Sequence, residues 1–81
     1  MSHSVRIADT ARPLTGEIVE VPAHIQTPST YTPTGRERKL RVGQIIEELP
    51  TLVVVQFFGY PHPWDYSRRE AGEFTLAAAI P

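Results

Sequence analysis

Residues 52–66 read LVVVQFFGYPHPWDY, and this stretch decides the fold. It begins as an almost unbroken apolar run and continues as a segment crowded with rings and prolines. The run Leu52–Phe58 has the length of a strand and is apolar on both faces except at Gln56, which predicts a strand buried on both sides. Two prolines then restrict the backbone between Tyr60 and Tyr66. We therefore expect a central strand followed by a stiff surface loop that presents aromatic side chains.

The flanking segments predict further strands and one helical turn. Three short segments have the alternating apolar residues or the β-branched residues that are typical of strands: 4–8, 17–21 and 74–80. In the second of these, we place the core on the side of the valines. Ser67 and Glu70 have the spacing of a capping box, which predicts a helical turn that starts there and ends near Gly72.

Two segments between these strands are harder to interpret. Residues 22–35 are rich in proline and threonine, and we expect a long loop. Residues 36–49 fit a strand, but they also fit a helix with an apolar stripe that Pro50 would end. Gly43 and the β-branched residues around it count against the helix. We favour the strand, and keep as the alternative an α+β fold with a helix at 36–49 on a small sheet.

The predicted order of elements resembles a known architecture. GQIIEELPTLVVVQF, a polar-aromatic loop, DYSRRE and FTLAAAI follow one another as in small SH3-like barrels of the Tudor or KOW kind. The resemblance covers about the second half of the chain, and the proline-threonine loop departs from it. It implies a mostly β, five-stranded barrel with one short helical turn. It also implies an aromatic cage, for which the matching positions are Tyr60, Trp64 and Tyr66.

Size and composition set the class of protein. The 81 residues suffice for a single domain spanning 1–81, and 41% hydrophobic residues are enough for one core. The formal net charge of −1 gives no overall basic field. No cysteine is present, and no apolar stretch approaches the roughly 20 residues of a membrane span. We expect a cytoplasmic protein with no membrane partner, no cofactor and no metal site.

The aromatic-proline loop is the main candidate binding site. Rings on a stiff backbone bind a ligand with little loss of conformational entropy. The competing interpretation is that these rings fill one end of the core. We therefore predict that the chain is a small binding or adaptor module for a protein, a peptide or another ligand. The candidate ligand-binding residues are Phe58, Tyr60, His62, Trp64, Tyr66 and Arg68.

A basic cluster offers a second candidate site. Residues 36–41 contain four cations and one acid, Glu37, so the segment carries a net charge of +3. Such a cluster can contact phosphates, which makes a nucleic-acid-binding domain an alternative function. It can equally be a solvated strand edge whose charges prevent aggregation. The candidate nucleic-acid contacts are Arg36, Arg38, Lys39 and Arg41.

The second face of the central strand is a candidate interface. Leu52, Val54 and Phe58 share this face, and a small barrel buries only one face of each strand. An exposed apolar face of this kind marks a homodimer or a partner subunit. Alternatively, the long loop or the helical turn covers it.

Catalytic signals are weak, so we predict no enzymatic activity. The three histidines are scattered, and no nucleophile elbow or phosphate-binding loop is present. Residues 55–58, VQFF, are similar to the short strand motif of the plasmid-borne, trimethoprim-resistant dihydrofolate reductases, which build one site from four subunits. That family has tyrosine at the position of Phe58. An oligomeric enzyme with a site at a subunit interface, or a purely structural subunit, are the remaining alternatives.

Overall fold

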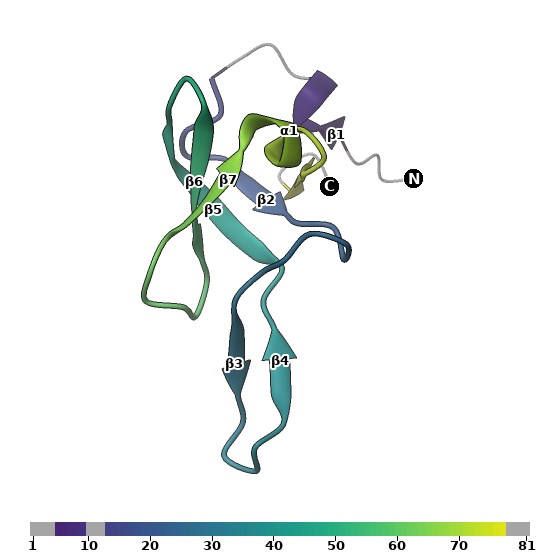
Figure 1. Ribbon diagram of the computed structural model, residues 1–81, viewed down its shortest axis with the longest axis vertical. Coiled ribbons are helices and arrows are strands. Elements are labelled where there is room, and N and C mark those ends of the chain that lie inside the picture. Colours follow the sequence, from purple (N-terminus) through teal and green to yellow (C-terminus); the bar gives the residue numbers. More distant parts are fainter. Residues whose placement is uncertain (1–4, 10–12, 78–81) are drawn as a thin grey trace.

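The computed structural model describes residues 5–9 and 13–77, and these form a mostly β structure (Figure 1). The strands are β1 (Val5–Arg6), β2 (Ile18–Glu20), β3 (Ser29–Tyr31), β4 (Glu37–Lys39), β5 (Val42–Glu48), β6 (Leu52–Phe57), β7 (Trp64–Ser67) and β8 (Thr75–Leu76). The helical segments are the 3-10 turn η1 (Ile7–Asp9) and the short helix α1 (Arg68–Ala71).

Six of the strands form one antiparallel sheet in the order β1-β8-β2-β5-β6-β7, and β3 pairs with β4 as a separate hairpin. The prediction of a mostly β chain with one short helical turn is confirmed. The pairing does not show the predicted closed, five-stranded barrel. Among the described residues, β1 and β7 are the two edges of the sheet, and no ladder joins them.

The segment 36–49 is extended, and the helical alternative is wrong. It contributes β4 to the hairpin and β5 to the main sheet, and β5 pairs with β2 on one side and β6 on the other. A helix here would have left the valine-rich strand without its central partner. The expected antiparallel pairing of the segment that ends at Glu48 with the strand after it is confirmed.

A β-bulge lies in β5. The register of β5 against β6 pairs Ile45 with Val55, but then shifts so that Glu47 pairs with Val54. The extra residue is Ile46, and a bulge of this kind bends a strand and increases its twist. Ile45 is buried, whereas Ile46 and Glu47 are both exposed, so the bulge interrupts the alternation and keeps Glu47 out of the core.

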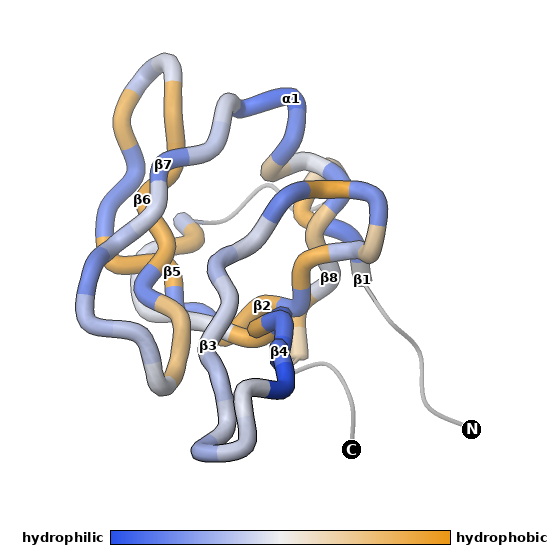
Figure 2. The backbone as a smooth tube through the Cα atoms, turned by 60° about the horizontal axis from the view of Figure 1, so that its bottom comes forward, coloured by the Kyte–Doolittle hydropathy of each residue, from blue (hydrophilic) through white to orange (hydrophobic). Residues whose placement is uncertain are grey.

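The core lies on one face of this bent sheet. Val53, Val55 and Phe57 of β6 point into it. The predicted burial of both faces of this strand holds at Val54 but not at Phe58, which is exposed. The burial of Val19 and Val21 confirms that the valine side of the second strand faces the core. The side chains with almost no exposure are Val19, Val21, Ile45, Val53, Val55, Phe57, Phe74 and Leu76. Figure 2 shows β4 as the most hydrophilic strand.

The ends of the chain differ from their predicted strands. Only Val5–Arg6 of the segment 4–8 is a strand, because the chain turns into η1 and buries Ile7. Of the segment 74–80, Thr75–Leu76 forms β8, and residues 78–80 lie outside the described part of the chain.

The predicted loop at 22–35 is partly a strand. Ser29–Tyr31 pairs with Glu37–Lys39, so the prediction of loop throughout this segment is wrong for β3. Proline and threonine suggested irregular backbone, but both prolines nearest to β3 lie outside the paired residues. The ladder therefore loses no donor to them.

The helical turn is confirmed with its caps. The Ser67 hydroxyl accepts from the Glu70 backbone N–H at 3.1 Å, and the Glu70 carboxylate accepts from the Ser67 N–H at 3.2 Å. This reciprocal pair satisfies two donors that the first turn of a helix leaves free. The helix ends at Gly72, where the Gly72 N–H donates to the Arg68 carbonyl at 3.0 Å.

Gly43 allows β5 and β6 to approach closely. A Cβ atom at this position would lie 2.8 Å from the Gln56 carbonyl oxygen, 2.8 Å from Val55 Cγ1 and 3.0 Å from Phe57 Cα. Two of these three atoms belong to the backbone of the neighbouring strand, so they cannot move aside cheaply. The same glycine that argues against a helix is required by the sheet.

We therefore expect Gly43→Ala to destabilise the protein by about 1–3 kcal/mol, the usual cost of overpacking a core. Urea unfolding measures the change. Gly72→Ala is the matched control, because a Cβ there meets its nearest neighbours at 3.4–3.6 Å, an ordinary contact distance. Equal stability losses in the two variants would contradict the close approach at Gly43.

Candidate functional site

Two side chains fix the segment that leads into the β3–β4 hairpin. The Arg41 guanidinium donates from Nη1 to the carbonyls of Pro22 and Ile25, each at 3.1 Å. The Tyr66 hydroxyl donates to the Gln26 carbonyl at 2.8 Å. These bonds connect residues 22–26 to the start of β5 and to β7, which sets where β3 begins.

The hairpin itself is closed by a short turn. The Gly35 N–H donates to the Thr32 carbonyl at 2.8 Å, and the Thr32 hydroxyl accepts from the Arg36 N–H at 3.1 Å. Gly35 has φ of +85°, a left-handed conformation that favours glycine. Figure 1 shows the hairpin extending away from the main sheet.

A groove lies between the hairpin and the junction of β5 with β6. It has a volume of about 410 Å³. Its walls are apolar on the side of the sheet, where Val42 and Phe58 are neighbours because the Phe58 N–H donates to the Val42 carbonyl at 3.2 Å. The residues that line it are Thr30, Arg38, Lys39, Leu40, Arg41, Val42, Phe58 and Gly59.

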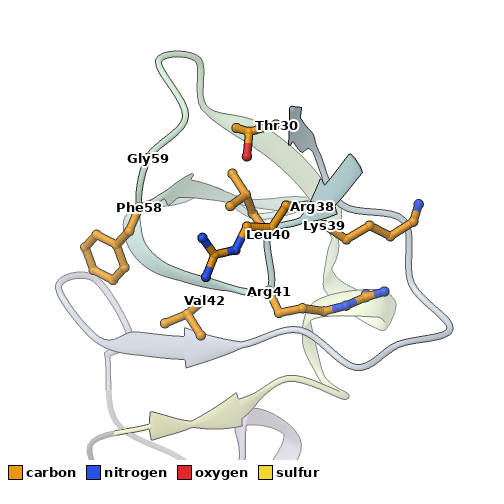
Figure 3. Close-up of a pocket in the computed structure, with 8 residues that line it drawn as sticks. All are labelled: Thr30, Arg38, Lys39, Leu40, Arg41, Val42, Phe58 and Gly59. Carbon is orange, nitrogen blue, oxygen red and sulfur yellow. The ribbon is translucent and has the colours of Figure 1, made fainter. Parts of the chain in front are cut away.

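Arg38 is the charged group that faces this apolar wall. Figure 3 shows its guanidinium directed toward Phe58 and Val42, whereas Lys39 and Arg41 extend the other way. No carboxylate among the described residues lies within ion-pair distance of Arg38. Phe58, whose side chain is 51% exposed, is open to solvent beside it. The groove therefore combines an exposed ring, aliphatic side chains and, in Arg38, an unpaired cation directed at them.

The structure separates the predicted ligand-binding set. Phe58 lies in the groove, while Arg68 lies at the opposite end of β6, because Ser67 pairs with Leu52. Tyr60 and Trp64 are half-buried and pack against the core, and only His62 of the remaining rings is exposed.

Tyr66 is a core residue. Its side chain is 4% exposed, and its ring centroid lies 5.1 Å from that of Phe74 and 6.2 Å from that of Phe57, both at edge-on angles. Burial raises the pKa of its phenol to about 12. A chain of edge-on contacts continues outward through Trp64 and Tyr60. For these rings, filling the core explains the aromatic density of the loop better than a solvent-exposed cage does.

Arg68 is held by contacts with other residues of the protein. Its Nε donates to the Leu49 carbonyl at 3.0 Å, and its Nη1 lies 3.4 Å from Glu48 Oε2. Glu48 Oε1 accepts from the N–H groups of Leu14 at 2.6 Å and Thr15 at 3.0 Å. The bond from Leu14, with those from Thr15 and Arg68, lowers the pKa of Glu48 below its ordinary 4.5. This network joins residues 14–15, the end of β5 and α1.

The predicted interface set is divided. Val54 is 8% exposed, and its cross-strand neighbours are Glu47 and Asp65. Leu52 is half-buried, and Gln56 lies between Val54 and Phe58 on this face. The three residues therefore do not form one continuous exposed apolar patch.

The basic cluster also divides. Arg41 is half-buried and holds residues 22–25, as described above. Arg36, Arg38 and Lys39 are exposed on the hairpin. Sequence reasoning missed the contributions of Thr30, Leu40 and Val42 to the groove. For Leu40 and Val42 the signal was their apolar character on either side of Arg41, but the sequence does not show that they line a groove until the strand pairing is known. Thr30 gave no such signal.

No comparison assigns the chain to a family. Protein-family models, curated proteins and solved structures all gave no match. Within the described part of the chain, no group of three or more metal-ligating side chains gathers. Over residues 5–9 and 13–77, the structure has no helix with the length and apolar character that crossing a bilayer requires.

Tyr66→Phe tests the bond between β7 and the segment before the hairpin. We expect a loss of about 1 kcal/mol in the free energy of unfolding, because the Gln26 carbonyl loses its donor. Tyr66→Ala should cost about 3–5 kcal/mol through the cavity it leaves. Chemical denaturation measures both, and a Tyr66→Ala variant as stable as the parent would show that this ring is not core.

Glu48→Gln tests the carboxylate network through pH. The lowered pKa in the folded protein means that the stabilisation is present above pH 4.5 and is lost as the pH falls through the folded-state value. At neutral pH we expect the variant to be less stable by about 1–2 kcal/mol. Unfolding curves should show this difference shrinking as the pH falls below 4.5. Glu47→Gln, on the exposed part of the same strand, is the control, and an equal pH dependence in both variants would contradict the assignment.

Proposed function

We propose that the protein is a small binding module that recognises a short extended peptide in the groove between the β3–β4 hairpin and the β5–β6 junction. The observation that supports this most directly is the exposed Phe58 ring beside the free guanidinium of Arg38. The peptide segment that fits has an apolar side chain next to a carboxylate.

The chemistry of the lining favours a peptide. Leu40, Val42 and Phe58 offer apolar contacts, and Arg38 offers a planar donor that matches a carboxylate. The Thr30 hydroxyl, across from Arg38 in the hairpin register, adds a group that can donate or accept. A volume of about 410 Å³ lies in the range of small-ligand sites, enough for a few side chains.

The fold supports a binding role for this position. The order β8-β2-β5-β6-β7, with α1 directly before β8, fits the SH3-like arrangement that the sequence resembles. In this arrangement the groove is formed by the long connection between β2 and β5 together with the connection after β6. Fold alone does not assign function, so the proposal depends on the groove's side chains.

We propose binding rather than catalysis because of what lines the groove. The ionisable side chains in its lining are the cations Arg38, Lys39 and Arg41, and no carboxylate, histidine or tyrosine lines it. General acid or base chemistry needs a group whose pKa lies near the working pH.

The test uses short random peptides displayed on phage and selected against the full chain. We expect the selected sequences to share an apolar residue followed or preceded by Asp or Glu. Phe58→Ala should weaken binding of a selected peptide by at least about tenfold, as expected for a central interface ring. Arg38→Gln should weaken it by about tenfold and reduce the preference for the acidic residue.

Tyr31→Ala is the matched control. Tyr31 is an exposed ring of the same hairpin, but the strand alternation places it on the face opposite Thr30 and Arg38. Its removal should leave peptide affinity unchanged. The proposal fails if no sequence is enriched, or if Tyr31→Ala weakens peptide binding as much as Phe58→Ala does.

A further inference from the structure

We infer that the β3–β4 hairpin, with Tyr31 at its centre, is a second binding surface, for single-stranded nucleic acid. This goes beyond the proposed peptide site, because Tyr31 does not line the groove. The register of the hairpin pairs Ser29 with Lys39 and Tyr31 with Glu37, so these four share one face. Tyr31, with 68% of its surface exposed, is the most exposed of the chain's large hydrophobic side chains in the described part.

The charge distribution favours an anionic polymer at the hairpin. Residues 36–41 carry +3, and because the whole chain carries −1, the other residues together carry −4 at neutral pH. A polyanion is therefore attracted to the hairpin and repelled by the rest of the molecule. The hairpin also extends from the sheet (Figure 1), so a strand can reach it without approaching the acidic surface.

The cations of the hairpin are free to contact phosphates. No carboxylate among the described residues lies within ion-pair distance of Arg36, Arg38 or Lys39. Strand alternation places Lys39 on the face of Tyr31 and Arg38 on the face of the groove, so a strand that contacts both follows the edge of the hairpin. The one acid between them, Glu37, accepts a hydrogen bond from the Ser29 hydroxyl at 2.9 Å. That bond holds its carboxylate on the hairpin beside Ser29.

The exposed Tyr31 ring favours single-stranded over double-stranded nucleic acid as the ligand. A base can stack on an aromatic side chain only when it is unpaired and accessible, and such stacking tolerates any base. Tyr31 lies on the same face as Lys39, so a base on the ring and a phosphate on the ammonium group can be held together. A paired duplex would use the cations alone. We therefore assign single-stranded DNA or RNA as the ligand class.

The two surfaces can be tested separately. Figure 3 shows the Arg38 guanidinium directed to the groove and the Lys39 side chain extending away from Phe58. Tyr31 does not line the groove, so its substitution should affect nucleic-acid binding alone. Substitution of Phe58 should affect peptide binding alone.

The experiment measures the fluorescence anisotropy of labelled oligothymidylate and oligouridylate as the full chain is added. We expect binding whose affinity falls with salt, with a log–log slope of about −2 for three phosphate contacts on a single strand. Tyr31→Ala should lower the affinity about tenfold without changing the slope. Lys39→Gln should lower it and make the slope shallower by roughly 0.7. Comparing the two oligonucleotides distinguishes DNA from RNA.

The controls separate this inference from electrostatic attraction alone. Arg69→Gln removes one charge from α1, away from the hairpin, and should leave affinity and slope unchanged. Phe58→Ala should also leave both unchanged. Three results would each overturn the inference. They are absence of binding at low salt, equal affinity for a duplex of the same length, and an affinity of the Tyr31→Ala variant equal to that of the parent. A variant set that loses oligonucleotide binding but keeps peptide binding would support both surfaces.

Discussion

The close approach of β5 to β6 at Gly43 is the constraint on which the rest of the structure depends. β5 is the only strand that pairs with both β2 and β6 among the described residues. At Gly43 a neighbouring backbone carbonyl fills the space in which a side chain would stand. This contact holds Phe57 and Val55 against the core and joins the two halves of the sheet. The bulge at Ile46 then bends β5 so that both halves cover the same core.

The groove follows from the same register. Because Phe57 pairs with Gly43 and points inward, Phe58 must point outward beside Val42. The chain leaves the hairpin after Lys39 and enters β5 at Val42, with Leu40 and Arg41 between the two strands. Arg41 also fixes the segment that leads into the hairpin, because it donates to the carbonyls of Pro22 and Ile25. Phe58 and Arg38 therefore face each other as a consequence of one strand pairing and one arginine.

Much of this architecture could be predicted from local patterns. The apolar run of β6, the valine side of β2 and the capping box at Ser67 depend on residues a few positions apart, and all three are confirmed. The extended form of residues 36–49 was also predictable, because Gly43 and the β-branched residues around it disfavour a helix. The hairpin was not, because Ser29–Tyr31 has no apolar alternation and is ordered by its partner strand.

The candidate site was harder to predict, because it depends on contacts between distant residues. The sequence shows that the rings between Phe57 and Tyr66 are clustered, but whether each is core or surface depends on burial. Tyr66 is buried, and its hydroxyl donates to the carbonyl of Gln26, 40 residues away. No spacing rule in the sequence reveals this contact. Phe58 was predicted as a binding residue, and it is exposed. Its partner Arg38 was assigned to a different candidate site, since only the folded hairpin brings the two together.

The most direct measurement of the central pairing is a set of nuclear Overhauser contacts in the free protein. We predict a strong contact between the Hα protons of Gly43 and Phe57, and a second between the Phe58 ring and the Val42 methyl groups. A shift of β6 by one residue would reverse both faces of the strand and place the Phe58 ring against the core methyl groups of Val19 or Ile45. Observation of those core contacts, without the Gly43 to Phe57 contact, would contradict the register and the groove that depends on it.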